Sequence, residues 1–236
     1  MSTIIPAIIP ETVKDLRSKV DLVARDVHVV HIDMCDGKYV PNVSWPYAYE
    51  WNDFDQFENE EEGLPHWEDV EYEIDLMVSR PREAMERWIR AGAAAFIVHA
   101  ENLKENFDEL LTLAHDGLCK LGVAFLPTTD ISSDPIYTEM ITKADFVQCM
   151  GIARIGYQGQ DFDERVFDQI EKVLEIKPDA DIAVDGHVDL DNIQDLYHAG
   201  VSKFVMGSAI YNEEPESIPQ VIAEAKSLLH DASDIL

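Results

Sequence analysis

Short β-branched runs alternate with longer amphipathic stretches along the whole chain. The short runs predict strands at residues 3–9, 27–33, 72–78, 95–99, 123–126, 146–150, 182–185 and 204–206. The amphipathic stretches predict helices at residues 11–24, 81–91, 103–119, 134–142, 164–176, 190–199 and 216–229. Strands that alternate with helices are joined by crossovers and run parallel. Eight such strands within 236 residues predict a closed (β/α)8 barrel, an α/β fold that forms a single domain over residues 1–236.

Glycines mark the ends of several predicted helices. Gly92, Gly117, Gly122 and Gly200 each follow a helical stretch shortly before a predicted strand. Glycine readily adopts the left-handed conformation that commonly ends a helix. We therefore expect helix C-caps at these four positions.

One connection is much longer than a strand-to-helix loop requires. Residues 43–71, which we call the excursion, hold several aromatic side chains and an acidic run from Glu50 to Glu62. The excursion leaves the strand at 27–33 at its carboxyl end, on the face where barrels of this class carry their active sites. It predicts either a structural cover or oligomer contact, or a lid over the site.

The charge of the chain is strongly negative, with 47 Asp and Glu against 18 Lys and Arg and a formal net charge of −29. Such a charge excludes nucleic acids as partners, because their phosphates would be repelled. It also argues against anionic membrane surfaces. The acidic residues are spread along the whole sequence, so we interpret them as a solvated surface and look for function in local clusters.

The compartment can also be inferred from the sequence. No apolar run approaches the roughly 20 residues that span a bilayer, and the N-terminus lacks the features of a secretory signal. The three cysteines, Cys35, Cys119 and Cys149, are widely spaced and are interpreted as free thiols in a reducing cytosol. We therefore expect a cytoplasmic protein.

Polar side chains stand at the carboxyl ends of several predicted strands, where barrel enzymes place their chemistry. His31 and Asp33 end one strand and share a face because side chains alternate along a strand. Asp75 lies on the next strand, His99 ends the one after it, and Asp185 ends the strand at 182–185. Three converging carboxylates repel one another unless a cation is present. His31, Asp33, Asp75 and Asp185 therefore predict a divalent metal site, since His plus carboxylates is a suitable ligand set.

Glycine-containing turns follow the last three predicted strands. Glycine lets backbone N–H groups approach an anion, and a following helix adds positive potential, so these turns predict a phosphate site. Arg154 could add a charge there, or it could form a surface salt bridge instead. The predicted phosphate-binding residues are Gly159, Gly186, His187, Gly207, Ser208 and Arg154.

Several of these residues stand within longer motifs. The segment at 31–42, HIDMCDGKYVPN, resembles the signature of ribulose-phosphate 3-epimerases, H-[VI]-D-[VI]-M-D-G-x-[FY]-V-P-N. Residues 74–77 resemble the family's V-H-L-M, and residues 150–160 resemble its M-S-V-x-P-G-F-G-G-Q. Residues 184–187 resemble V-D-G-G, and residues 207–210 match G-S-A-I. The resemblance covers residues 4–212 apart from the excursion.

The resemblance implies a barrel of the ribulose-phosphate-binding type that inverts C3 of a phosphorylated ketose. The default reaction interconverts ribulose 5-phosphate and xylulose 5-phosphate. His31, Asp33 and Asp185 match three metal ligands of the family, and Asp33 and Asp185 also match its catalytic acid/base pair. Inversion needs a base on one face and an acid on the other, with one divalent ion stabilising the enediolate between them. Family members are often dimers or larger, which implies a homo-oligomer.

The chain departs from the family pattern in the glycine-rich loop at residues 153–158, where Ala153, Arg154 and Ile155 intervene and Gln158 replaces a Gly, and at four single positions. Asp75 replaces the second metal-binding His, Ala7 replaces a substrate-contacting Ser, His187 replaces the last Gly of V-D-G-G, and Cys35 replaces a Met. Three carboxylates against a charge of +2 leave a formal charge of −1, which favours harder ions such as Mn²⁺, Fe²⁺ or Mg²⁺, with Co²⁺ and Zn²⁺ less favoured. These changes leave two alternatives open: another sugar-phosphate isomerase or lyase, or a barrel that binds a phosphate ligand without turnover.

Overall fold

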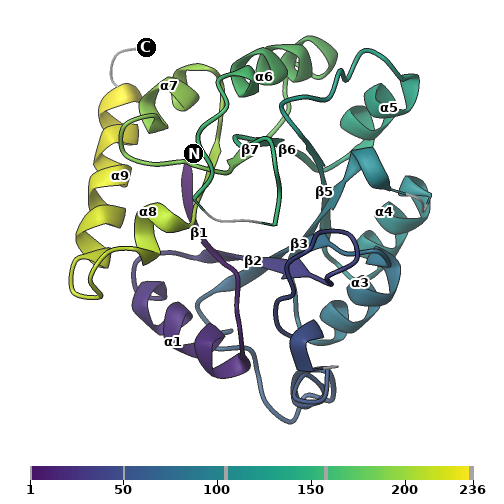
Figure 1. The fold of residues 1–236 in the computed structure, drawn as a ribbon, viewed down its shortest axis with the longest axis vertical. Helices are drawn as coiled ribbons and strands as arrows, with labels where there is room; N and C mark the ends of the chain where they lie inside the picture. Colours follow the sequence, from purple (N-terminus) through teal and green to yellow (C-terminus); the bar gives the residue numbers. More distant parts are fainter. Residues whose placement is uncertain (1, 50, 104–105, 157–158, 234–236) are drawn as a thin grey trace.

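Eight parallel strands close into a barrel in the order β1-β2-β3-β4-β5-β6-β7-β8 in the computed structural model of this chain. Helices surround the barrel on all sides (Figure 1). The structure describes residues 2–49, 51–103, 106–156 and 159–233. The predicted (β/α)8 barrel is therefore confirmed.

The elements follow the predicted alternation. The strands are β1 (Thr3–Ile8), β2 (Val29–Cys35), β3 (Glu71–Met77), β4 (Ala95–His99), β5 (Lys120–Phe125), β6 (Phe146–Met150), β7 (Ile182–Asp185) and β8 (Lys203–Met206). The α-helices are α1 (Val13–Val23), α2 (Asp55–Glu58), α3 (Pro81–Arg90), α4 (Phe107–Asp116), α5 (Pro135–Lys143), α6 (Arg165–Ile176), α7 (Ile193–His198), α8 (Ser208–Tyr211) and α9 (Ile218–Ser233). Two short 3₁₀ helices are η1 (Tyr47–Tyr49) and η2 (Ala100–Asn102).

The largest difference from the predicted strands is at β5, which begins at Lys120 rather than at residue 123. Gly122 lies inside this strand, so the expected helix cap there is wrong. A Cβ atom at Gly122 would lie 2.4 Å from the ring of Phe146 on β6. Glycine is therefore needed at this position to make room for an aromatic ring inside the barrel.

The other three expected glycine caps are confirmed in part. Gly92 and Gly200 have φ angles of 91° and 105°, the left-handed conformation that was predicted. Gly117 ends α4 with a φ of −82°, and the next residue, Leu118, takes the left-handed conformation with a φ of 61°. Helix α4 begins at residue 107 rather than 103, because the side chain of Asn106 accepts a hydrogen bond from the Asp108 N–H and caps it.

The alternation of side chains along each strand divides the core into two layers. Ile32 and Met34 of β2 face outward into a large cluster between the barrel and its helices. Ile97, Ala124 and Phe146 face the barrel axis in a smaller cluster. Polar side chains replace this inner apolar layer near the carboxyl ends of the strands, and that is where the candidate site lies.

The excursion packs against α3 through aromatic side chains. Trp45 and Phe54 are fully buried, and the Trp45 ring lies 5.5 Å from Phe54 and 5.9 Å from Trp88 between centroids. Arg87 on α3 lies 4.4 Å above the Trp51 ring and donates a 2.7 Å hydrogen bond to Glu58. The described part of the excursion contributes no residue to the pocket that contains Asp33 and Asp185. These contacts favour the structural cover over the lid.

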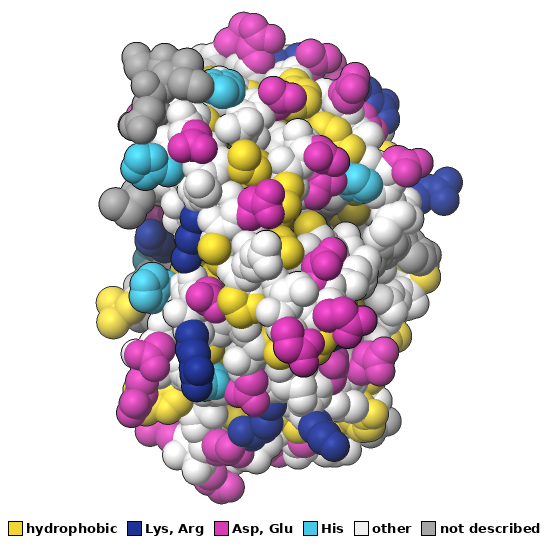
Figure 2. Space-filling model, turned by 90° about the vertical axis from the view of Figure 1, so that its left-hand side faces the viewer, with side chains coloured by type: hydrophobic (Ala, Val, Ile, Leu, Met, Phe, Trp, Pro, Cys, Tyr) yellow, Lys and Arg dark blue, Asp and Glu magenta, His cyan; other side chains and the backbone are white. Residues whose placement is uncertain are grey.

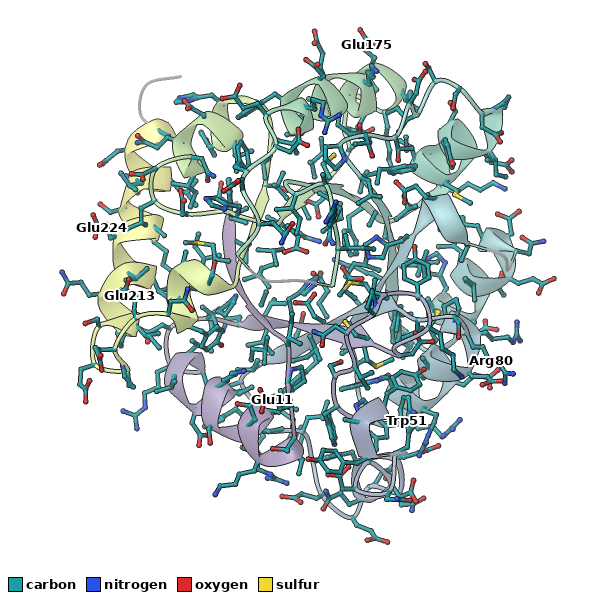
Figure 3. The ribbon with its side chains drawn as sticks, viewed as in Figure 1. Glu11, Trp51, Arg80, Glu175, Glu213 and Glu224 are labelled. Carbon is teal, nitrogen blue, oxygen red and sulfur yellow. The ribbon has the colours of Figure 1, made fainter. Side chains whose placement is uncertain are left out.

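Acidic side chains are scattered over the surface rather than gathered in one patch. Figure 2 shows them over one whole face, with fewer Lys and Arg side chains between them. Glu175, Glu213 and Glu224 point outward from the ring of helices (Figure 3). This distribution agrees with a solvated acidic surface. No helix in the described ranges is both long enough and apolar enough to cross a membrane.

Candidate active site

The register between β2 and β3 places polar side chains side by side at the mouth of the barrel. Asp33 stands opposite Asp75, and His31 stands opposite Glu73. All four are buried, with exposed fractions of 0% for His31 and Asp75, 3% for Glu73 and 8% for Asp33. Because the strands are hydrogen-bonded along their length, this part of the site is held rigidly.

The four predicted metal-binding side chains come together. One possible ligand atom from each of His31, Asp33, Asp75 and Asp185 lies within 4.8 Å of those from the other three. The Nε2 atom of His31 lies 3.5 Å from Asp33 Oδ1 and 3.7 Å from Asp75 Oδ2. These distances exceed hydrogen-bond length, so the cluster encloses a space lined by oxygen and nitrogen atoms.

The tautomer of His31 suits a metal ligand. Its Nδ1 atom lies 2.9 Å from Glu73 Oε1, and since a carboxylate only accepts, Nδ1 carries the proton. Its Nε2 atom is buried and has no hydrogen-bond partner among the described residues. A ligating His commonly donates its other ring N–H to a carboxylate in this way. The orphaned Nε2 and the three carboxylates therefore fit a divalent ion.

The electrostatics of the cluster favour the binding of a cation. Burial, together with the charges of Asp33 and Asp75, raises the pKa of Asp185 to about 8. Burial also raises the pKa of Asp33. Burial opposes the charge on His31, but the nearby carboxylates of Asp33, Asp75 and Glu73 outweigh it and raise the His31 pKa. A divalent ion would remove this conflict by stabilising all three carboxylates as anions.

Asp75 differs from its neighbours because it already has partners. Burial would raise its pKa, but the charge of His99, the nearby imidazole of His31 and the hydrogen bond from His99 lower it. Glu73 and Gln148, as well as this contact of His99, were missed at the level of the sequence. Glu73 could have been found, because it lies two residues before Asp75 and so shares its face of the strand. Gln148 left no comparable signal.

The turn that follows β2 ties the candidate ligands to β3. Asp36 accepts hydrogen bonds from the backbone N–H and the hydroxyl of Ser79, at 2.7 and 2.6 Å, and from the N–H groups of Lys38 and Tyr39. Burial opposes the charge on Asp36, but these hydrogen bonds lower its pKa. Gly37 has a φ of 72°, which only glycine adopts easily. The acidic residue and glycine of this motif therefore have structural roles.

A pocket opens beside the cluster on the side of β7 and β8. It is bordered by Asp33 and Asp185, and by Ala7 and Met77 on its apolar side. Five of the six predicted phosphate-binding residues also line it, namely Gly159, Gly186, His187, Gly207 and Ser208. The structure thus brings the predicted acid/base pair and the predicted phosphate turns to one pocket.

Two backbone positions after β7 are left-handed, Gly186 with a φ of 105° and His187 with a φ of 55°. Such a conformation is unfavourable for a residue with a side chain. The Nδ1 atom of His187 donates a 2.5 Å hydrogen bond to the carbonyl oxygen of Gln160, in the loop after β6. This bond links the two loops that border the pocket and helps to offset the unfavourable backbone.

The structure does not bring Arg154 into this pocket. Ile152 and Ile155 pack towards the interior of the barrel on either side of it, so the Arg154 side chain is left exposed. Arg154 is not among the residues that line the pocket. Tyr157 and Gln158, in the altered glycine-rich loop, lie outside the described residues.

Comparison with known proteins tests the resemblance. A sequence model described as the ribulose-phosphate 3 epimerase family matches residues 3–211. The chain belongs to the ribulose-phosphate 3 epimerase family. Ribulose-phosphate 3-epimerase from Escherichia coli (strain K12) is 30% identical over 216 residues, which cover 89% of this chain and 88% of that protein. The protein of the same name from Aquifex aeolicus (strain VF5) is 28% identical over 214 residues, 88% of this chain and 87% of that protein.

Solved structures agree on the fold. The crystal structure of 3-hexulose-6-phosphate synthase from Salmonella typhimurium matches with a TM-score of 0.67, covering 98% of this chain and 99% of that chain. Its sequence identity is only 16%, so this likeness concerns the barrel alone. Membership of the ribulose-phosphate 3 epimerase family confirms the expectation of an isomerase-class enzyme.

Proposed function

We propose that this protein is a metal-dependent epimerase that inverts C3 of a phosphorylated ketose, with ribulose 5-phosphate and xylulose 5-phosphate as the default pair. The observation that carries this proposal is the pocket in which Asp33 and Asp185 meet the turns after β7 and β8. Family relatives that cover most of the chain are named for the same reaction. No other pair of carboxylates lines this pocket in the described part of the chain.

Asp33 and Asp185 would act as the acid/base pair. They belong to different strands, β2 and β7, and so can reach the reacting carbon from different directions. One carboxylate would remove the C3 proton, and the other would return a proton to the opposite face. Burial raises the pKa values of both groups when no ion is bound, and a bound ion would counter that shift.

His31, Asp33, Asp75 and Asp185 would hold the divalent ion. When bound, the ion would supply positive charge that stabilises the enediolate form of the substrate. Three oxygen donors and one nitrogen favour Mn²⁺, Fe²⁺ or Mg²⁺ over Zn²⁺. The buried hydrogen bond from His31 to Glu73 would keep the imidazole oriented with or without the ion.

The phosphate group would bind to the backbone on the far side of the pocket. Gly186, His187, Gly207 and Ser208 offer N–H groups there, and Gly159 closes the edge. Glycine at these turns leaves the backbone open to an anion. A site made of backbone N–H groups also suits this protein. Its acidic surface would repel phosphate, so binding requires several donors gathered in one place.

The deciding experiment follows exchange of the C3 proton. Incubation of the Mn²⁺-loaded protein with ribulose 5-phosphate in deuterium oxide should incorporate deuterium at C3 and produce xylulose 5-phosphate, both detected by NMR. Chelation of the ion should stop both processes. Absence of exchange with any pentulose or hexulose phosphate would overturn the proposal. The alternative would then be a barrel that binds a phosphate ligand without turnover. The Asp75 residue, which stands where the family has a His, favours this alternative.

Three further expectations belong to this proposal. We infer that the barrel and the excursion form one domain, which is supported by their shared aromatic core. The acidic surface and the family reaction support a cytoplasmic protein. The tendency of family members to associate supports a homo-oligomer, and sedimentation analysis would measure its size.

A further inference from the structure

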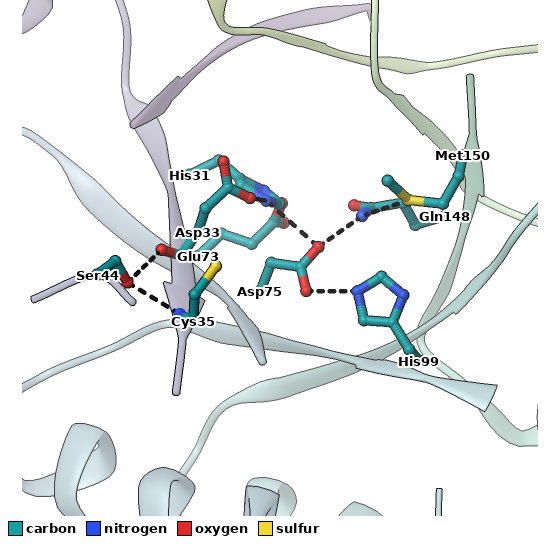
Figure 4. A network of polar contacts seen from close by, with 9 residues as sticks. All are labelled: His31, Asp33, Cys35, Ser44, Glu73, Asp75, His99, Gln148 and Met150. Carbon is teal, nitrogen blue, oxygen red and sulfur yellow. Dashed lines mark hydrogen bonds and ion pairs between the residues drawn. The ribbon is translucent and has the colours of Figure 1, made fainter. Parts of the chain in front are cut away.

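Asp75 is the most enclosed carboxylate of the candidate metal site. Its side chain is fully buried, and both of its oxygen atoms accept hydrogen bonds. Oδ1 lies 2.8 Å from Nε2 of His99, and Oδ2 lies 3.0 Å from Nε2 of Gln148 (Figure 4). The two donors come from β4 and β6, so they reach the carboxylate from different strands.

The hydrogen bond from His99 has a defined direction. A carboxylate can only accept, so the proton between the two groups is on His99 Nε2. His99 is 2% exposed, and its ring lies 6.0 Å from the ring of Tyr39 between centroids. Its Nδ1 atom is buried and has no hydrogen-bond partner among the described residues. The contact with Asp75 is thus the main polar contact that this imidazole has in the described part of the site.

The orientation of the Gln148 amide is fixed by the same argument. Reversal of the amide would place its Oε1 atom against a carboxylate oxygen, which is repulsive. Gln148 is fully buried, and its Nε2 atom also lies 3.4 Å from the sulfur of Met150. Its Oε1 atom lacks a hydrogen-bond partner among the described residues. A buried amide that leaves one end unsatisfied is costly, so its donor end must have a use.

We infer that His99 and Gln148 are positioning residues that hold the Asp75 carboxylate in the orientation required to bind the divalent ion. The inference rests on the proposed metal site. A carboxylate can rotate about its last bond, and a donor on each oxygen fixes that rotation. The arrangement matches that of His31, which Glu73 orients from behind. His31 and Asp75, two of the three candidate ligands on β2 and β3, thus each have buried partners.

Metal affinity tests this inference without any measurement of activity. The affinity for Mn²⁺ is measured by competition with a chromogenic chelator, for wild type and for His99→Leu and Gln148→Leu. Loss of such an outer partner typically weakens metal binding about 10–100-fold, and we expect this range for each variant. Gln169→Leu is the matched control, since Gln169 is 3% exposed and donates a 3.1 Å bond to the Leu126 carbonyl away from the site. Its affinity should equal that of wild type.

A double-mutant cycle separates positioning from general damage. If His99 acts through Asp75, His99→Leu should cause little further loss of affinity in the Asp75→Ala background. Additive losses would overturn the inference. His99→Gln keeps an N–H donor and should recover part of the affinity, which keeps the test usable if His99→Leu does not fold. Failure of His99→Gln to recover any affinity would also count against the inference.

The outcomes also distinguish this inference from the proposed function. Wild-type affinity in both His99→Leu and Gln148→Leu, with weaker binding in Asp75→Ala, would overturn the positioning role and leave the metal site standing. Unchanged affinity in Asp75→Ala would remove Asp75 from the ligands and the inference with it. A wild-type protein that binds no Mn²⁺ would overturn both the metal site and the inference.

Discussion

The two sides of the barrel mouth are built differently. On the side of β2, β3 and β4, buried side chains on paired strands form the site, and their neighbours are set by the register of the sheet. On the side of β7 and β8, Asp185 ends a strand, and the rest of the site consists of turns, with left-handed backbone at Gly186 and His187. The first arrangement suits groups that must hold an ion and move a proton, because each atom is fixed. The second suits an anion, which needs an open backbone more than a particular side chain.

The largest effect should come from the two residues that belong to the proton chemistry. Asp33→Asn and Asp185→Asn should each lower the rate of epimerisation by about 10²–10⁴-fold, because inversion needs a group on each face. One variant should still exchange deuterium into C3 of a single epimer, as a one-sided base allows. Near-normal epimerisation by both variants, as measured by NMR, would show that these two carboxylates do not carry the proton transfer.

Asp185, at the end of β7, should also make folding dependent on pH when no divalent ion is present. The pKa of Asp185 is raised to about 8 by burial and neighbouring carboxylates. Its stabilising contribution is complete below the unfolded-state pKa and is lost as pH rises through the folded value. The free energy of unfolding in urea should therefore fall between about pH 4 and pH 8, by an amount on the order of a few kcal/mol.

Two comparisons check that origin of the pH dependence. The fall in the free energy of unfolding with rising pH should be smaller in Asp185→Asn. Saturation of wild type with Mn²⁺ should also make it smaller. An unchanged slope in Asp185→Asn would assign the pH dependence to other groups, such as Asp33 and His31, whose pKa values are also raised.

Asp75→His should move the preference of the site from Mn²⁺ towards Zn²⁺ by roughly tenfold, since an imidazole replaces a hard oxygen ligand. Elemental analysis after loading with an equimolar mixture of the two ions measures this ratio. Asp75→Asn is the control that removes the charge without adding an imidazole. The same ratio of Mn²⁺ to Zn²⁺ in Asp75→His and wild type would show that residue 75 does not determine which ion is bound.

His187→Gly tests the turn side and should have a modest effect. The substitution removes the hydrogen bond to Gln160 but also relieves the left-handed backbone, and these two changes partly cancel. We expect KM for the sugar phosphate to change by a few-fold, with Mn²⁺ affinity unchanged. A loss of metal affinity in this variant would mean that the two sides of the mouth are not independent.

Arg154→Ala should have the smallest effect. Arg154 is exposed and lies outside the residues of the pocket, so KM should stay within about twofold of wild type. Steady-state kinetics at low and moderate salt would measure this. A clear rise in KM would show that the loop after β6 reaches the phosphate when substrate binds.

The polar residues on β2 and β3 were easier to predict from the sequence than the turns after the later strands, for a physical reason. Alternation along β2 places His31 and Asp33 on one face, and strand order brings Asp75 beside them, so local patterns were sufficient. The contact between Asp75 and Gln148 joins strands that are not neighbours in the barrel. It depends on how far two side chains reach across the interior, which no periodicity records.

The turns and some boundaries were harder for a related reason. Gly122 was expected to cap a helix. Instead it makes room for the ring of Phe146, which lies 24 positions later on the next strand. Arg154 was expected either to contact the phosphate or to form a surface salt bridge, and the packing of Ile152 and Ile155 leaves its side chain exposed and outside the pocket. Such outcomes depend on competition for space, whereas the strands follow from composition and period.

The aromatic packing of the excursion has a consequence for spectroscopy. The four tryptophans of the chain are Trp45, Trp51, Trp67 and Trp88, and all lie in the excursion or on the helix beside it. Trp45 and Trp88 are fully buried, whereas Trp67 is 63% exposed. Tryptophan fluorescence therefore reports on the sector around β2 and α3 and carries no direct signal from β5 to β8. A change in tryptophan emission during unfolding would therefore follow the loss of structure in that sector alone. The opposite half of the barrel could unfold without changing the emission.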